Sequence, residues 1–194
     1  MKKARIAVLV SGGGTNLQAL LDAQRGGVLQ SGEIVLVVSG NPKAYALERA
    51  KQSGVEAVVL TGPGFERDLA ALLTERGIDL IILAGFMRIL SADFTSRYPN
   101  RILNVHPALI PSFCGQGYYG LRVHEAALSR GVKVTGATVH FVNEIPDGGE
   151  ILLQKAVDVL PGDTPETLQR RVMEQAEWSL LPQAAEMVSK GLTT

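Results

Sequence analysis

Asn104 and His106 are the side chains whose type and spacing most readily suggest chemistry. They lie two residues apart in "ILNVHPALIPSF", residues 102–113, where an apolar run ends before two prolines. Residues at this spacing point to the same side of a β-strand. An imidazole, with an ordinary pKa of about 6.5, can give and take a proton near neutral pH, and an amide can hold an oxygen that gains negative charge. The sequence leaves open whether His106 does this or is an ordinary histidine near a strand end.

Asp147 is the carboxylate that could complete this group. It lies in the turn-rich segment "NEIPDGG", residues 143–149. A carboxylate near His106 would stabilise the charged form of the imidazole. An acid beside two glycines is also an ordinary turn residue, so both interpretations stay open. Of the other two histidines, His140 fits a structural or a functional role equally well, and His124 fits a surface or packing position on a helix.

A glycine-rich turn, "SGGGTN" at residues 11–16, stands between an expected strand and an expected helix. Glycines there let backbone N–H groups approach a ligand, and the start of a helix favours an anion. A dinucleotide site is not indicated, because Leu17 stands where the third glycine is needed and residues 39–41 contain no acid for a ribose. The turn also lacks a Walker lysine. A phosphate monoester site and a tight turn without a ligand are the two interpretations that remain.

The positions of these groups depend on an expected alternation of strands and helices. Continuous apolar runs indicate strands that are covered on both faces, as in a parallel sheet, and the amphipathic segments between them indicate helices. In such a sheet, ligands bind beyond the C-terminal ends of the strands, where both His106 and the glycine turn are expected. The expected strands are residues 5–10, 33–40, 55–60, 79–85 and 101–106.

The pattern changes after residue 130. Residues 131–142 and 150–160 have the character of two long strands with no helix between them, which predicts an antiparallel pair. A terminal helix follows, with Thr164 as its N-cap and Pro165 as its first residue. The expected fold class is α/β: a single domain, residues 1–194, with a doubly wound, mostly parallel, Rossmann-like sheet, a C-terminal antiparallel strand pair and a terminal helix.

Composition narrows the class of protein. The 194 residues are 46% apolar and 20% charged, and 19 basic residues balance 19 acidic ones, which argues against a nucleic-acid partner. The single cysteine, Cys114, excludes an intrachain disulfide, and no Cys/His cluster suggests a metal. No segment approaches the ~18 apolar residues of a membrane span. We therefore expect a soluble cytoplasmic protein; the oligomeric state stays open, a homodimer included.

Five stretches together resemble the phosphoribosylglycinamide formyltransferase family, which transfers a formyl group from 10-formyltetrahydrofolate to the amine of glycinamide ribonucleotide in de novo purine biosynthesis. The resemblance covers nearly the whole chain and implies one formyltransferase domain, two small-molecule substrates and no metal. Asn-x-His-Pro-Ser/Ala-Leu-Leu/Ile-Pro is specific to folate-dependent formyl transfer, and the glycine turn narrows it to a nucleotide substrate. The stretches are "SGGGTNLQALLDA", "LAGFMRILSADF", "LNVHPALIPSF", "KVTGATVHFVNEIPDGGEILLQ" and "EWSLLP".

The resemblance also implies roles for individual residues. Asn104, His106 and Asp147 match the catalytic trio of the family. Residues that match the ribonucleotide site are Gly14, Thr15 and Asn16 for the phosphate and Glu177, with Glu174 beside it, for the ribose. Residues that match the folate site are Met87, Arg88, Ile89, Leu90, Asn104, Asn143, Glu144, Ile145, Pro146 and Asp147.

Three departures from the family pattern stand out. The segment "GQGYYGLRVHEAAL", residues 115–128, is longer than usual and carries Arg122 where many members have histidine. The arginine that often meets the folate tail ahead of the third helix has no counterpart in "TGPGFERD", residues 61–68. The last helix holds one extra residue before Glu177.

Three other functions share part of this pattern. A formyltetrahydrofolate hydrolase would use water in place of the amine, but that family reads Asn-x-His-His, whereas this chain has Pro107. Methionyl-tRNA formyltransferases share the trio and add a C-terminal domain and a basic surface. The third is a phosphate-binding module without chemistry.

Attack of the amine on the formyl carbon would leave a negative charge on the formyl oxygen. In the expected mechanism, protonated His106 and the amide of Asn104 stabilise this oxyanion, and Asp147 relays a proton through water. Cys114 is expected to be a loop residue.

Overall fold

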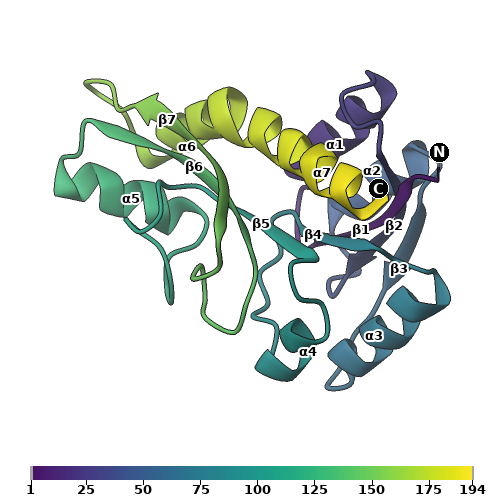
Figure 1. Ribbon diagram of the computed structural model, residues 1–194. Coiled ribbons are helices and arrows are strands. Elements are labelled where there is room, and N and C mark those ends of the chain that lie inside the picture. The colour runs from purple at the N-terminus through teal and green to yellow at the C-terminus, as the bar shows by residue number, and fades with distance from the viewer. Residues whose placement is uncertain (1, 194) are drawn as a thin grey trace.

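Seven strands form one sheet in the order β3-β2-β1-β4-β5-β6-β7 in the computed structural model, which describes residues 2–193 (Figure 1). The strands from β3 to β5 are parallel to one another, whereas β6 is antiparallel to both β5 and β7. The predicted α/β class, with its antiparallel C-terminal pair, is confirmed. The strands are β1 (Ala4–Val10), β2 (Gly32–Ser39), β3 (Glu56–Val59), β4 (Leu80–Leu83), β5 (Ile102–His106), β6 (Val134–Phe141) and β7 (Ile151–Asp158).

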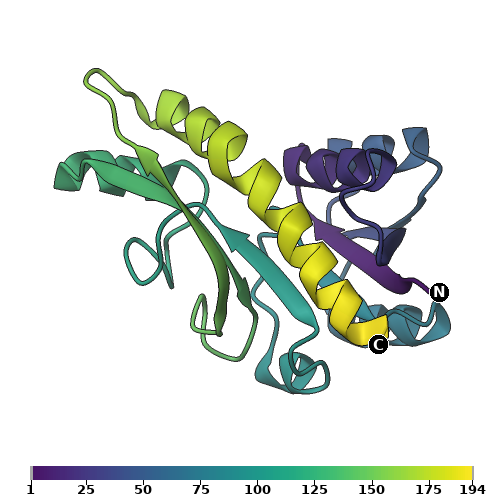
Figure 2. The same ribbon diagram turned by 45° about the horizontal axis from the view of Figure 1, so that its top comes forward.

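Helices cover both faces of the sheet. On one face the core includes side chains of α1, α2, α5, α6 and α7, and on the other face it includes those of α3 and α4. The sole π-helical segment of the described residues, η1, joins α6 to α7, so the three elements form one long helix across the sheet (Figure 2). The helices are α1 (Thr15–Arg25), α2 (Tyr45–Gln52), α3 (Phe65–Glu75), α4 (Ala92–Ser96), α5 (Leu121–Arg130), α6 (Pro165–Val172), η1 (Met173–Glu177) and α7 (Trp178–Thr193).

Strand β1 illustrates why continuous apolar runs form this sheet. Its residues alternate between the two cores: Ile6 and Val8 pack under α1 and α7, whereas Ala7 and Leu9 face α3 and α4. All four are fully buried, so neither face of the strand can carry a polar residue without loss of packing.

The long C-terminal helix begins where the sequence predicts. Thr164 is the N-cap and accepts a hydrogen bond from the backbone of Thr167, whose side chain accepts one from the backbone of Thr164 in return. Pro165 occupies the first turn, where its missing N–H costs nothing.

The strand order brings three strand ends together. β1 is the point at which the chain changes direction across the sheet, since β2 and β3 lie on one side of it and β4 and β5 on the other. The C-terminal ends of β1, β4 and β5 are therefore neighbours, and ligands of open α/β sheets bind at this point. The glycine turn after β1 adopts a left-handed backbone at Gly14 (φ 75°), where a Cβ atom would lie 2.6 Å from that of Ala46.

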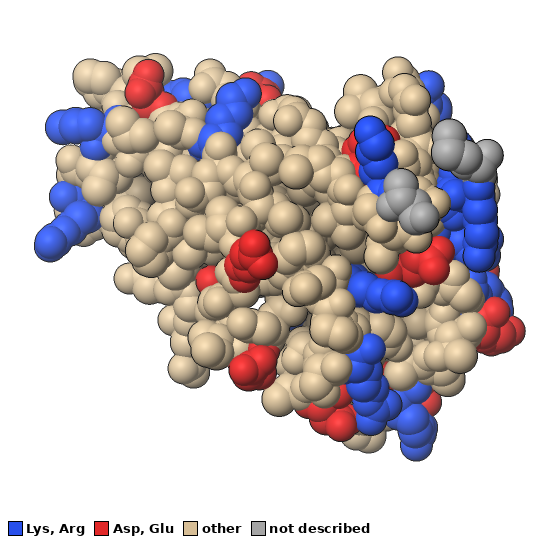
Figure 3. All heavy atoms as spheres, viewed as in Figure 1, with Lys and Arg blue, Asp and Glu red and all other residues tan. Residues whose placement is uncertain are grey.

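The surface carries charges of both signs. On the face shown in Figure 3, acidic and basic side chains are interspersed, in keeping with a formal net charge of zero. None of the helices in residues 2–193 combines the length and apolar character that a membrane span requires.

Candidate active site

A cavity of about 920 Å³ follows the C-terminal ends of β1, β4 and β5 and is bordered by the loop between β6 and β7. It brings together segments separated by more than a hundred residues in the sequence. Of the residues predicted for the site, all but Glu174 line it: Gly14, Thr15, Asn16, Met87, Arg88, Ile89, Leu90, Asn104, His106, Asn143, Glu144, Ile145, Pro146, Asp147 and Glu177.

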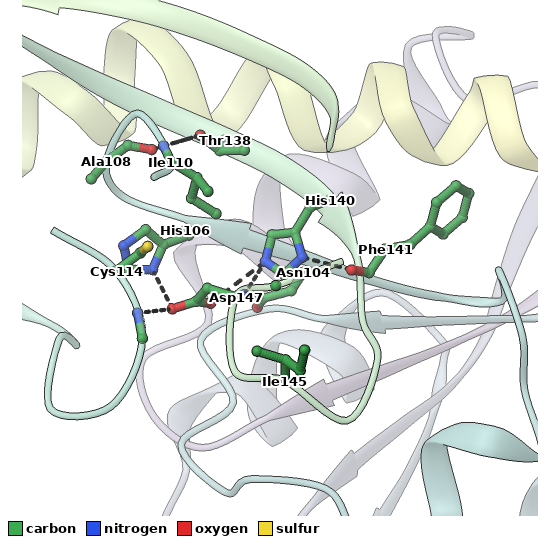
Figure 4. A network of polar contacts seen from close by, with 12 residues as sticks. Asn104, His106, Ala108, Ile110, Cys114, Thr138, His140, Phe141, Ile145 and Asp147 are labelled. Atoms are coloured by element: carbon green, nitrogen blue, oxygen red, sulfur yellow. Dashed lines mark hydrogen bonds and ion pairs between the residues drawn. The ribbon is translucent and has the colours of Figure 1, made fainter. Parts of the chain in front are cut away.

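His106 occupies the end of β5 and is buried, with 4% of its surface exposed. Its Nε2 atom lies 2.8 Å from the carbonyl oxygen of Phe113, so this nitrogen carries a proton and donates it. Nδ1, 3.5 Å from Asp147 Oδ2, is then the nitrogen that gains a proton when the ring becomes charged (Figure 4). Burial lowers the pKa of His106 below its ordinary value, and the negative charge of Asp147 opposes that shift.

Asp147 is held by groups from two other segments. Its Oδ2 atom accepts a hydrogen bond of 2.8 Å from the backbone N–H of Gly115, and its Oδ1 atom lies 3.5 Å from His140 Nε2. Its backbone is left-handed, with φ 55°. Burial alone would raise the pKa of the Asp147 carboxyl, but its contact with His140, the charge of His106 and the hydrogen bond from the backbone of Gly115 hold it below its ordinary value. The carboxylate is therefore ionised at neutral pH.

His140 belongs to the same network, a role that the sequence left open. The antiparallel register of β5 and β6 places it directly opposite Asn104, and its Nε2 atom is 3.2 Å from Asn104 Nδ2. Its Nδ1 atom lies 2.7 Å from the carbonyl oxygen of Phe141, which fixes the proton on Nδ1. His140 thus orients the amide of Asn104 from behind. His124, by contrast, is a fully buried packing residue of α5 whose ring nitrogens have no partner among the described residues.

The segment that follows β5 supplies backbone groups that no sequence signal indicated. Phe113 gives the carbonyl that meets His106, and Gly115 gives the N–H that meets Asp147. Cys114, between them, donates a hydrogen bond from its thiol to the carbonyl of Pro111. Burial raises the pKa of this thiol, and the negative charge of Asp147 raises it further. A thiol whose pKa is raised is a poor nucleophile, in line with its expected role as a loop residue.

The first and last helices meet at the other end of the cavity. Asn16 Nδ2 donates a 2.7 Å hydrogen bond to Glu177 Oε2, and both side chains are buried. Burial raises the pKa of Glu177 to about 7. Thr15 follows the glycine turn, with its hydroxyl 3.8 Å from the sulfur of Met173.

The π-helical segment explains where Glu174 lies. A π turn is wider than an α turn and accommodates one additional residue. Gln169, Met173 and Glu177, spaced four residues apart, line the cavity, whereas Glu174 is exposed and pairs with Arg170 at 2.8 Å. The structure thus brings Glu177 to the cavity and leaves Glu174 outside it; on this long helix, Gln169 and Met173 line the cavity although the sequence prediction missed them.

Apolar side chains surround the cavity mouth. Met87, Ile89 and Ile145 are each more than half exposed, which is costly unless a ligand covers them. Arg88 lies with its guanidinium 4.6 Å from the ring centre of Phe65. This wall is suited to a planar aromatic ligand. Among residues 2–193, no group of three or more His, Cys, Asp or Glu side chains is arranged to hold a metal ion.

Comparison with known proteins decides the family. Residues 4–185 match the formyl transferase family. The chain belongs to this family. It is 40% identical to phosphoribosylglycinamide formyltransferase of Haemophilus influenzae, over 98% of this chain and 89% of that protein. It is 43% identical to the human trifunctional purine biosynthetic protein adenosine-3, over 98% of this chain, but spans only 19% of that longer protein.

Solved structures of other proteins share this fold. Glycinamide ribonucleotide transformylase 1 from Symbiobacterium toebii superimposes with a TM-score of 0.90 at 44% identity, over 97% of this chain and 89% of that one. A formyltetrahydrofolate deformylase from Pseudomonas syringae shares the fold at 23% identity and a TM-score of 0.85, with 99% of this chain but 62% of that chain covered.

Proposed function

We propose that this formyl transferase moves the formyl group of 10-formyltetrahydrofolate to the amine of glycinamide ribonucleotide, giving formylglycinamide ribonucleotide and tetrahydrofolate. The observation that carries the proposal is one cavity that joins Asn104, His106 and Asp147 to a glycine turn and to Glu177. The proposal is also supported by relatives named phosphoribosylglycinamide formyltransferase, which match this chain over nearly its full length. In this proposal residues 1–194 form one formyltransferase domain, and the protein is located in the cytoplasm.

The reaction needs stabilisation of an oxyanion. The neutral amine attacks the formyl carbon, a C–N bond forms, and the carbonyl oxygen takes up the negative charge. We assign Asn104 and the Nδ1–H of charged His106 to this oxygen, because they lie on the same side of β5. Burial makes the charged ring the minor form at neutral pH, and the negative charge of Asp147 favours the charged form.

Proton transfer completes the reaction. The amine nitrogen becomes positively charged on attack and must lose one proton. In our proposal that proton passes through water to Asp147, which lies at the edge of the cavity with 15% of its side chain exposed. The bond from the carbon to N10 of the folate then breaks as N10 takes up a proton. Holding amine and donor together supplies a further large share of the rate.

The two ends of the cavity suit the two substrates. We assign the phosphate to the turn of Gly14 and Thr15, where backbone N–H groups and the start of α1 favour an anion, and the ribose to Asn16 and Glu177. The pterin is assigned to the apolar wall of residues 87–90 and to the loop 143–147. The cavity volume of about 920 Å³ is near the upper end of the range of small-molecule sites.

One assay separates this function from its rivals. The protein is incubated with 10-formyltetrahydrofolate, with and without glycinamide ribonucleotide, and tetrahydrofolate and formate are measured. We expect tetrahydrofolate to form only when the amine is present, and no formate. Formate release without the amine would identify a hydrolase, and no turnover in either mixture would leave a binding module.

A further inference from the structure

The glycine turn presents its N–H groups because α2 holds its carbonyls. The carbonyl oxygen of Gly12 accepts a 3.1 Å hydrogen bond from the backbone N–H of Ala46, and that of Gly13 accepts a 2.8 Å hydrogen bond from Arg49 Nε. In a trans peptide the C=O and the next N–H point in opposite directions. The N–H groups of Gly13 and Gly14 are therefore turned away from α2, and neither has an acceptor among residues 2–193.

The lining of the cavity has too little positive charge for a phosphate. Glu144 and Asp147 bring carboxylates to the cavity wall, Glu177 adds a carboxyl group whose pKa is raised to about 7, and Arg88 is the one arginine or lysine there among the described residues. A phosphate ester carries close to two negative charges at neutral pH. Backbone N–H groups alone would have to offset both the ligand charge and this acidic lining.

Arg49 is the cation that lies directly behind the turn. Its Nη1 atom donates to Gln18 Oε1 at 3.0 Å, and its guanidinium lies 5.1 Å from the ring centre of Tyr45. No carboxylate among the described residues is within ion-pair distance of it, so its charge is not neutralised by a neighbour. Its Cδ atom would lie 3.4 Å from a Cβ at Gly14.

We propose that Arg49 is a positioning residue for the phosphate, acting through the Gly13–Gly14 peptide without touching the ligand. Its hydrogen bond fixes the plane of this peptide with the N–H toward the cavity. A charged donor on the carbonyl also polarises the peptide, which strengthens the N–H as a donor to an anion. This inference rests on the proposed function and adds to it the residue that gives the turn its affinity for a dianion.

The test compares a substrate that has the phosphate with one that lacks it. Arg49→Met removes charge and hydrogen bonds, Arg49→Lys keeps the charge, and Arg25→Met removes an exposed arginine at the far end of α1 as a control. We expect Arg49→Met to raise KM for glycinamide ribonucleotide about tenfold, with kcat and KM for the folate unchanged. Its kcat/KM for the dephosphorylated nucleoside should stay at the wild-type value. Arg49→Lys should recover part of the loss, and Arg25→Met should show none.

Equal losses on the two substrates would assign Arg49 a merely structural role, and no loss on either would remove it from the site; both results overturn the inference. Binding of ribose 5-phosphate, with ribose as its control, gives a readout that needs no turnover. If the wild-type protein transfers no formyl group, the proposed function fails. Tighter binding of ribose 5-phosphate by the wild-type protein than by Arg49→Met would still support the role of Arg49 in positioning the phosphate. Equal or undetectable ribose 5-phosphate binding by both would overturn it.

Discussion

Replacing Asp147 with asparagine removes one negative charge from the centre of the site and changes little else. Asparagine tolerates the left-handed backbone that Asp147 adopts, whereas alanine would add strain. The new side-chain oxygen can still accept the hydrogen bond from Gly115, so the loop after β5 should keep its place. The variant therefore tests the charge of the group rather than its shape.

The size of the effect follows from the distance to His106. A charged imidazole and the carboxylate are 3.5 Å apart, Nδ1 to Oδ2, which corresponds to about 5 kcal/mol of attraction at an effective dielectric constant of about 20. Without this attraction only the hydrogen bond to the carbonyl of Phe113 opposes the burial that lowers the pKa of His106, so the charged ring becomes rarer at pH 7. The proposed proton acceptor for the amine is lost as well. We expect kcat to fall by about 10²–10³-fold.

The assay is steady-state formyl transfer across pH, with folate binding measured separately. Affinity for the folate should change by less than about threefold, because the apolar wall is untouched. The rate of the variant should rise as pH falls over a range where that of wild type has levelled, since acid restores the charged imidazole. Glu150→Gln, which removes an exposed carboxylate from the same connection, is the matched control. Wild-type turnover in Asp147→Asn would refute the reasoning.

Three further predictions concern other parts of the site. His106→Ala should lose at least about 10² in kcat because it removes the proposed donor to the oxyanion, and near wild-type turnover with both substrates would contradict this role. Glu177 has its pKa raised by burial to about 7 from 4.5, so its contribution to stability is present below pH ~4.5 and is lost as pH rises through ~7. Glu177→Gln should remove this slope and raise the free energy of unfolding at pH 8 by up to about 3 kcal/mol, measured in urea; an unchanged slope would exclude Glu177 as its source. Deletion of Gln175, which is exposed in η1, should convert this segment into a regular α-helix that keeps Glu177 in the cavity. The melting temperature and KM for the ribonucleotide should therefore change little. Loss of folding would contradict this prediction.

Much of the parallel half of the molecule could be predicted because its signals are local. Apolar runs covered on both faces, glycine after β1 and the spacing of Asn104 and His106 each follow from a few consecutive residues. The rule that strand ends share one edge of a parallel sheet then brings the glycine turn and His106 together without knowledge of the strand order.

Other parts of the site depend on tertiary contacts that leave no local signal. His140 lies in a strand whose other residues are mostly apolar, and only its register opposite Asn104 brings it into the network. The carbonyl of Phe113 and the N–H of Gly115 act through the backbone, which is the same for nearly every residue type. Sequence patterns therefore identify the acid–base candidates but not the groups that fix their protons.

Asp147 lies between these two cases, because its residue type suggests chemistry but its position near His106 is difficult to predict from the sequence. β6 is antiparallel to β5, and Phe141 at its end pairs with Leu103, near the start of β5 and away from His106. The loop after β6 must therefore fold back along the sheet before a carboxylate can approach the imidazole. Gly149 permits this return, because a Cβ atom there would collide with the carbonyl oxygen of Phe141. The glycines that are typical of a turn are thus also what allow the loop to bring Asp147 close to His106. For this reason the sequence alone could not decide between a turn residue and a partner of His106.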